Sequence, residues 1–402
     1  MDILKALFLL FVLIFPITEV GRIQFANGVA VSINDIFLFA VIVVWIIRYI
    51  YSAKNKKVKS NILTKPAVVF LSICFLSLII NIPNLNLEKF LISFSYLVRF
   101  SSYLLIYFIV KEFDKNFKSK LEYALLFSGT AVVAIGYIQF FFYPSLRNLF
   151  YLGWDEHLYR MFSSFLDPNF AGAFFVLFFI FSLIFVYRFI QLRNLLKLFL
   201  TSIISIFTFI AVYLTYSRSA FLMLILSVCA YLFLLKKRKL IFFVAGAIIL
   251  LIFLAPKSFK TEGTDLFRIT STYERVGSVR AAIDIFGKSP VIGVGFNAYR
   301  YALNKYEKMD NSFWQTTHSG GGTDNSFLFV LATTGIIGLT SYFYLLYKIF
   351  KLGKENLKKN KYSIALVSIM IGLIINSLFV NSLFFVFILE WVFIIAGLTE
   401  SS

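Results

Sequence analysis

The sequence predicts an all-α, polytopic integral membrane protein with about twelve transmembrane helices. Hydrophobic residues make up 60% of the 402 residues and charged residues only 15%, whereas soluble proteins average about 25% charged residues. The apolar residues fall in runs of bilayer length, and one large polar loop, residues 256–323, interrupts them. We therefore expect a single membrane domain, residues 1–402, with an extracytoplasmic loop that contains short amphipathic helices.

Each apolar run long enough to cross the hydrocarbon layer is assigned to one span. The runs lie roughly at 3–18, 34–51, 66–82, 90–110, 121–142, 170–188, 197–215, 219–235, 239–255, 324–347, 362–379 and 381–398. The first run resembles the apolar part of a signal peptide, but it lacks a small-residue cleavage site, so we expect it to remain as a span. The polar loop connects the ninth span to the tenth.

The basic residues orient these spans. Five alternate loops contain twenty-three lysines and arginines, whereas the short loops on the other side contain five. Because basic residues concentrate in cytoplasmic loops, we expect both termini in the cytoplasm. The polar loop then lies outside, together with the 143–169 loop and the short turn at Ser217–Ser219. The same clustering accounts for the net charge of +19 without a nucleic-acid partner.

The few cysteines and histidines argue against a metal site or a disulfide. Cys74 and Cys229 each lie inside an apolar run, where cysteine behaves as a small hydrophobic residue. Two histidines in the whole chain make zinc ligation improbable. We therefore expect no metal and no cofactor.

The turn before the eighth span places Arg218 at the outer membrane interface. Almost no loop separates the seventh span from the eighth, so the guanidinium of Arg218 lies at the depth of lipid phosphates. It can be a snorkelling interfacial anchor or an anion clamp, because a guanidinium presents paired donors that suit phosphate.

The polar loop contains a predicted amphipathic helix. Ser271–Glu274 fits a capping box at its start, and Gly287–Pro290 provides its end. At helical spacing Arg275 shares the packing face with Val279, Ala282, Ile283 and Phe286, whereas Arg280, Asp284 and Lys288 share a solvated face. An arginine on a packing face needs an anion, which a protein carboxylate or a substrate phosphate can supply.

The loop ends in a glycine-rich run that leads to Asp324 at the start of the tenth span. The three glycines between His318 and Asp324 allow the backbone to approach a ligand closely. Asp324 can cap the following helix or serve as a catalytic carboxylate, and the two roles are compatible.

Two charged residues lie within predicted spans. Arg99 is near the middle of the fourth span and Glu390 near the middle of the last. A charge at the centre of the bilayer costs about 2.5–3.5 kcal/mol on insertion scales and normally faces a partner or a watery cavity. Arg99 and Glu390 can pair with each other, or Arg99 can contact a lipid-linked phosphate.

An ordered set of short motifs resembles the O-antigen ligase and O-antigen polymerase superfamily. The motifs are Asp167-Pro168-Asn169, Ser217-Arg218-Ser219-Ala220, Arg275 ahead of Pro290–Phe296, Asp324–Leu328 and Gly335–Leu339. The resemblance implies a multi-span glycosyltransferase that needs no metal and acts at the outer face of the membrane. It also implies an undecaprenyl-pyrophosphate-linked glycan donor.

The resemblance assigns roles to individual residues. Arg218 and Arg275 match the pyrophosphate-contacting arginines of the family. Ligases usually have a histidine, thought to activate the acceptor hydroxyl, where this sequence has Asp324, and this departure favours a polymerase. His318 is an alternative base, although its register does not match. Further candidate contacts to substrate are Arg99, Arg160, Asn169, Arg280 and Asn325.

The sequence therefore predicts a polysaccharide polymerase of the bacterial cytoplasmic membrane, with Asp324, Arg275 and Arg218 as its catalytic residues. Its partners would be the undecaprenyl-pyrophosphate-linked donor, an acceptor glycan and membrane lipids, with chain-length regulator or flippase proteins as candidate protein partners. The alternatives are a ligase that transfers finished glycan to a lipid or wall acceptor, and a lipid-linked oligosaccharide flippase. A flippase would place charges across several spans and show repeated halves, whereas this chain concentrates polar groups in one loop.

Overall fold

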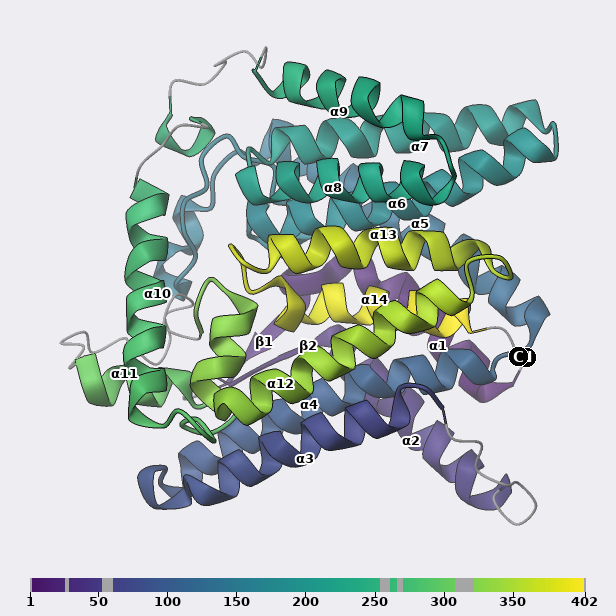
Figure 1. Cartoon of the computed structure of the whole chain (residues 1–402). Coiled ribbons are helices and arrows are strands. Elements are labelled where there is room, and N and C mark those ends of the chain that lie inside the picture. The colour runs from purple at the N-terminus through teal and green to yellow at the C-terminus, as the bar shows by residue number, and fades with distance from the viewer. Residues whose placement is uncertain are drawn as a thin grey trace.

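A computed structural model describes residues 2–25, 29–52, 61–253, 261–265, 270–307 and 322–400. Most of its helices run side by side, and the chain places a helix in every apolar run that was predicted to span the bilayer (Figure 1). These helices are α1 (Ile3–Ile14), α2 (Ile33–Ser52), α3 (Thr64–Ile80), α4 (Leu87–Glu112), α5 (Lys115–Phe142), α6 (Pro168–Gln191), α7 (Leu195–Leu214), α8 (Arg218–Leu234), α9 (Arg238–Phe253), α12 (Ser326–Glu355), α13 (Lys361–Asn376) and α14 (Val386–Thr399).

The helix lengths support the all-α membrane class but not the full count of spans. Seven segments in the described part of the chain are long and apolar enough to cross a membrane: Ile3–Gly21, Ile33–Tyr51, Leu87–Glu112, Lys115–Phe142, Pro168–Gln191, Leu195–Leu214 and Ser326–Glu355. Four further apolar helices, α3, α8, α13 and α14, are shorter, with 17 residues or fewer. The number twelve therefore stays a prediction.

Helix α14 lies at the centre of the bundle. Every residue from Phe387 to Thr399 is buried, which explains why the sequence there is apolar on all sides. Small residues let neighbouring helices approach closely. A Cβ on Gly397 would lie 2.7 Å from the Cβ of Val110 on α4, and one on Gly372 of α13 would lie 2.0 Å from the hydroxyl oxygen of Ser227 on α8.

Helix α12 is broken at Gly335, where the segment before α11 (Tyr299–Glu307) crosses it. Gly335 has φ 66° and ψ −168°, which is not helical. The break frees main-chain groups of α12, and the crossing segment pairs with them: Val294 donates to the carbonyl of Ala332 at 3.1 Å, and Ile336 donates to the carbonyl of Pro290 at 3.0 Å. Exposed backbone groups are costly in a membrane protein, so the paired segment makes the break tolerable.

Two side chains of α3 complete this crossing. The hydroxyl of Ser77 lies 2.7 Å from the carbonyl oxygen of Ile292 and 2.9 Å from that of Thr333. The amide nitrogen of Asn81 donates to the carbonyl of Gly293 at 2.9 Å. The crossing therefore fixes the polar loop to the bundle at a defined position.

We expect Gly335→Ala to destabilise the protein strongly. A Cβ at this position would lie 2.3 Å from the main-chain carbon of Val291, and the positive φ adds strain for any side chain. Gly277→Ala is the matched control, because nothing lies within 4 Å of a Cβ there and alanine favours helix by about 1 kcal/mol. Thermal unfolding of both variants in detergent should show a clearly lower Tm for Gly335→Ala alone, and equal Tm values would contradict the crossing.

Two smaller features connect the bundle to its polar parts. The strands β1 (Arg22–Gln24) and β2 (Ala30–Ser32) pair antiparallel between α1 and α2; this hairpin was not predicted from the sequence. Helices α10 (Thr270–Lys288) and α11 lie at one end of the bundle, and Figure 1 shows α10 standing across the direction of the long helices. Residues of the predicted polar loop thus cover one end of the membrane domain.

Candidate functional site

Side chains from four parts of the chain meet where α6, α8 and α12 begin. They come from the segment before α6, the turn before α8, the first half of α10 and the segment before α12. A direct contact joins the last two, because the main-chain N–H of Asp324 donates to the hydroxyl of Ser278 on α10 at 3.2 Å. Because these four parts are far apart in the sequence, only the fold brings them together.

Arg160 ties the segment before α6 to the turn before α8. Its side chain is buried, its Nε donates to the carbonyl of Thr215 at 2.9 Å, and a terminal nitrogen donates to Oδ1 of Asn169 at 3.4 Å. The hydroxyl of Ser217 donates to the same Oδ1 at 2.9 Å. The predicted substrate contacts Arg160 and Asn169 are thus neighbours, and their polar groups hold the turn that leads to Arg218.

Arg218 is the first residue of α8 and is half-buried. The turn before it is tight, with Tyr216 in the left-handed region at φ 50°. Gly172 of α6 leaves room for this turn, since a Cβ there would lie 2.7 Å from the Cβ of Ala220. The start of a helix carries unsatisfied N–H groups and a partial positive charge, so the helix end and the guanidinium both favour an anion here.

The face of α10 that packs on the bundle carries Arg275, and the opposite face carries Arg280, as predicted. Ala282 and Ile285 are each 1% exposed. Arg275 lies half-buried on their side of the helix, whereas Arg280 is exposed to solvent. Two arginines of one helix therefore have different environments.

One detail of this helix was predicted wrongly. Ile283 is 51% exposed, because the buried stripe is centred on Ala281 and Ile285 and leaves position 283 beyond its edge. The predicted capping box at Ser271–Glu274 stays a prediction, because the side chain of Ser271 lies outside the described part of the chain. The predicted end of the helix at Lys288 is confirmed.

The charge of Arg275 interacts with three charged groups of the site. Burial lowers its pKa, the carboxylate of Asp324 raises it, the like charge of Arg218 lowers it and the carboxylate of Asp167 raises it. The structure thus brings Arg218 and Arg275 close enough for their charges to repel. Arg275 takes part in none of the salt bridges found within the described ranges, so carboxylates are near its guanidinium without contacting it.

Asp324 is not the cap of α12. The N-cap is Asn325, whose side-chain oxygen accepts from the N–H groups of Phe327 (2.8 Å) and Leu328 (3.0 Å). The amide nitrogen of Asn325 donates to the carbonyl of Leu378 at 3.0 Å. Capping thus occupies Asn325, a predicted substrate contact, and leaves the carboxylate of Asp324 available for another role.

The carboxylate of Asp324 has a raised pKa. Its side chain reaches solvent, yet the surrounding protein partly desolvates the carboxylate, and this effect outweighs the attraction of Arg275, which lowers the pKa. The negative charge of Asp167 raises it further. A carboxylate with a raised pKa is a stronger base than an ordinary aspartate, which suits it to accept a proton near neutral pH.

Asp167 belongs to the same group of charges and was not predicted as a site residue. It caps α6, and its carboxylate accepts from the N–H groups of Asn169 (2.6 Å) and Phe170 (3.4 Å). Burial raises its pKa, whereas these hydrogen bonds and the charge of Arg160 lower it. The Asp167-Pro168 pair is a typical start of a helix, and it was the visible signal in the sequence. The proximity of Asp167 to Arg275 could not be predicted, because it depends on the fold.

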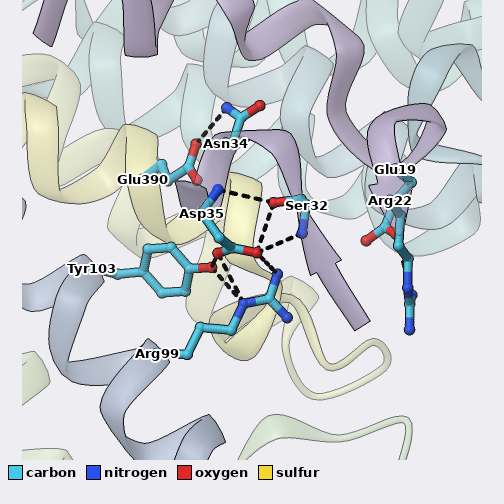
Figure 2. Close-up of polar contacts among 8 residues, drawn as sticks. All are labelled: Glu19, Arg22, Ser32, Asn34, Asp35, Arg99, Tyr103 and Glu390. Carbon is cyan, nitrogen blue, oxygen red and sulfur yellow. Dashed lines mark hydrogen bonds and ion pairs between the residues drawn. The ribbon is translucent and has the colours of Figure 1, made fainter. Parts of the chain in front are cut away.

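Arg99 is bound to a carboxylate that the sequence analysis missed. Its Nε donates to Oδ1 of Asp35 at 2.9 Å, and a terminal nitrogen donates to Oδ2 at 2.6 Å, a bidentate pair that the hydroxyl of Tyr103 joins (Figure 2). The paired geometry is the strong form of this interaction. Asp35 stands in the first turn of α2, and a carboxylate in an apolar run was the signal that could have identified it.

Glu390 does not pair with Arg99. It is fully buried, and within the described ranges its carboxylate accepts a hydrogen bond from the side chain of Asn34 at 3.4 Å (Figure 2). The suggested pairing of Arg99 with Glu390 is therefore wrong, since Asp35 takes that place. His318, the alternative base, lies outside the described residues.

A family comparison adds to this geometry. Residues 203–343 match the family model described as O-antigen ligase, and this segment contains Arg218, Arg275 and Asp324. The match confirms the resemblance to the O-antigen ligase and polymerase superfamily. A search of the curated proteins finds no match to this chain.

Proposed function

From the match of residues 203–343 to the O-antigen ligase family, we propose that this membrane protein is a polysaccharide polymerase. It transfers glycan repeat units from an undecaprenyl-pyrophosphate-linked donor to a lipid-linked acceptor sugar. The family match and the apolar helices support the coarser statement, a membrane enzyme that transfers glycans. The proposed location is the bacterial cytoplasmic membrane, with both termini in the cytoplasm and the site on the outer face.

One observation carries this proposal. Arg218 and Arg275 lie within electrostatic range of each other and of Asp324, although they come from different helices. Two partly buried guanidinium groups repel, and an anion between them removes the repulsion. A pyrophosphate provides two linked negative groups and can accept paired hydrogen bonds from both arginines.

The proposed reaction is a direct displacement at the anomeric carbon of the donor sugar. Asp324 accepts the proton of the attacking acceptor hydroxyl, whose oxygen forms the new bond to C1. The bond between C1 and the pyrophosphate oxygen breaks, and the polyprenyl pyrophosphate leaves with the bonding electron pair. Arg218 and Arg275 stabilise the negative charge that grows on the leaving group. Attack from the opposite face inverts the anomeric centre.

The reaction should weaken as the pH falls, because the proposed base must be deprotonated. Since the pKa of Asp324 is raised, its protonated form persists to a higher pH than in an ordinary aspartate of pKa about 3.9. We therefore expect the rate of chain extension to fall on acidification with a midpoint above about pH 4. The rate of product formation across a pH series measures this, and a rate that stays constant down to about pH 4 would contradict the role of Asp324.

Incubation of the purified protein with a lipid-pyrophosphate-linked repeat unit tests the proposal. A ladder of progressively longer lipid-linked products is expected of a polymerase. A single product on a foreign acceptor would favour a ligase, which the family description names. The absence of any new glycosidic bond would favour a transporter.

A further inference from the structure

The connection between α13 and α14, residues 377–385, packs against the start of α12. The main-chain N–H of Ser326 donates to the carbonyl of Ser377 at 2.9 Å, and the hydroxyl of Ser326 accepts from the N–H of Leu383 at 3.2 Å. Figure 1 shows this connection at the end of the bundle where α10 stands. Because Ser326 follows Asp324 by only two residues, the connection lies directly beside the segment that carries the proposed base.

Asn381, in this connection, faces the end of the glycine-rich run. A Cβ on Gly322 would lie 3.3 Å from the Nδ2 of Asn381 and 3.4 Å from a ring carbon of Phe329. The φ of Gly322 lies outside the left-handed region, so the backbone conformation does not require glycine there. The missing side chain instead leaves space between the amide and the ring, two residues before Asp324.

The amide of Asn381 is not satisfied by the protein. Its Oδ1 is buried and has no hydrogen-bond partner among the described residues, although the side chain as a whole is only half-buried. An unsatisfied buried polar group costs about 1–3 kcal/mol, and an apolar side chain of the same shape would avoid this cost. A ligand therefore explains asparagine at this position better than stability does.

The chemistry of the amide favours a neutral ligand with many hydroxyl groups. A side-chain amide has two donors and an acceptor but no charge, whereas Arg218 and Arg275 are the groups suited to phosphate. An apolar lipid chain would leave the amide unsatisfied. A sugar carries adjacent hydroxyl groups that each donate and accept, so one sugar can bond to both ends of the amide.

We propose that Asn381 is a sugar-binding residue, whose amide holds the glycan beside Asp324 and orients the hydroxyl that attacks. This inference rests on the proposed function. The sugar would enter beside Gly322, where the missing side chain gives access to the amide. Proton transfer requires the hydroxyl within hydrogen-bond reach of the base, so a residue that fixes the sugar there also contributes to the rate.

Asn376, the last residue of α13, provides a matched control. Residues 376–379 and 381–384 have the same sequence, Asn-Ser-Leu-Phe. Both polar atoms of the Asn376 amide also have no hydrogen-bond partner among the described residues, but this side chain is completely buried. Since a sugar reaches only a side chain that is partly exposed, replacing Asn376 should not change sugar binding.

The test compares two ligands of the full-length protein in phosphatidylcholine nanodiscs: undecaprenyl pyrophosphate, and the same lipid carrying the repeat unit. Asn381→Leu should raise the Kd of the glycan-bearing lipid by about tenfold and leave that of the bare lipid within about twofold. Gly322→Ala, which places a methyl group against the amide, should act in the same direction. Asn376→Leu should change neither Kd. Leucine has nearly the shape of asparagine, so the Tm of the ligand-free Asn381→Leu protein should not fall.

The outcomes separate this inference from the proposed function. Wild-type affinity of Asn381→Leu for the glycan-bearing lipid would overturn the sugar contact. Equal losses from Asn381→Leu and Asn376→Leu would also overturn it, because the effect would then come from the packing of the connection. In both cases a ladder of products made by the wild-type protein leaves the polymerase proposal standing, whereas absence of binding of either lipid would overturn both. If Asn381→Leu lowers the Tm, Gly322→Ala decides: unchanged affinity for the glycan-bearing lipid in that variant would overturn the contact.

Discussion

Replacing Arg275 by alanine should lower the rate of chain extension by about 10²–10³-fold, the cost of removing one preorganised donor to a developing charge. Arg275 is half-buried, interacts electrostatically with Arg218 and Asp324, and takes part in none of the salt bridges found within the described ranges. No carboxylate of those residues contacts its guanidinium, and the proposed pyrophosphate would supply that contact. Alanine is the best helix former, so the loss should not come from a weakened α10.

Arg280→Ala is the matched control for this prediction. Arg280 is on the same helix but exposed to solvent, and its removal should leave the rate within about twofold of the wild type. The measurement is product length and rate in the lipid-linked repeat-unit assay, with membrane abundance of each variant determined in parallel. Equal losses from Arg275→Ala and Arg280→Ala would refute the argument from the two faces of α10.

Asp324→Asn should lower chain extension by about 10²–10⁴-fold, the usual contribution of a general base, while donor binding persists. Asparagine keeps the size of the side chain, and the main-chain N–H that contacts Ser278 is unaffected. Helix α12 should also stay intact, since Asn325 rather than Asp324 caps it. Separate measurements of the rate and of undecaprenyl pyrophosphate binding check both halves of this expectation.

Asp284→Asn is the control, because Asp284 is an exposed carboxylate on the solvent side of α10. It should extend chains at the wild-type rate. Near-normal extension by Asp324→Asn would remove Asp324 from the chemistry, and His318 would then become the first candidate for the base.

Periodicity and composition were sufficient to predict most helices and the environment of Arg275. A charged residue on the packing face of an amphipathic helix is visible at helical spacing, and so is an exposed one such as Arg280. The error at Ile283 shows the limit of this method, because the exact centre of the buried stripe depends on how α10 crosses the bundle. The presence of the amphipathic helix α10 could be predicted, but its orientation against the bundle could not.

Contacts between distant parts of the chain could not be predicted. Asp35 is sixty-four residues from Arg99, and no local pattern connects them. The break at Gly335 likewise depends on the segment at Val291–Gly295, which supplies the hydrogen bonds that the broken helix lacks. The glycines were visible in the sequence, but the reason for them is a backbone crossing that exists only in the folded chain.

The most direct test of the central claim, that Arg218 and Arg275 hold one pyrophosphate together, is a double-mutant cycle on undecaprenyl pyrophosphate binding. Each single change to glutamine should raise the Kd of the donor site by at least about tenfold. The double variant should show a clear coupling between the two positions, because both guanidinium groups contact the same anion. Wild-type affinity in either single variant, or strictly additive effects in the double variant, would contradict the claim.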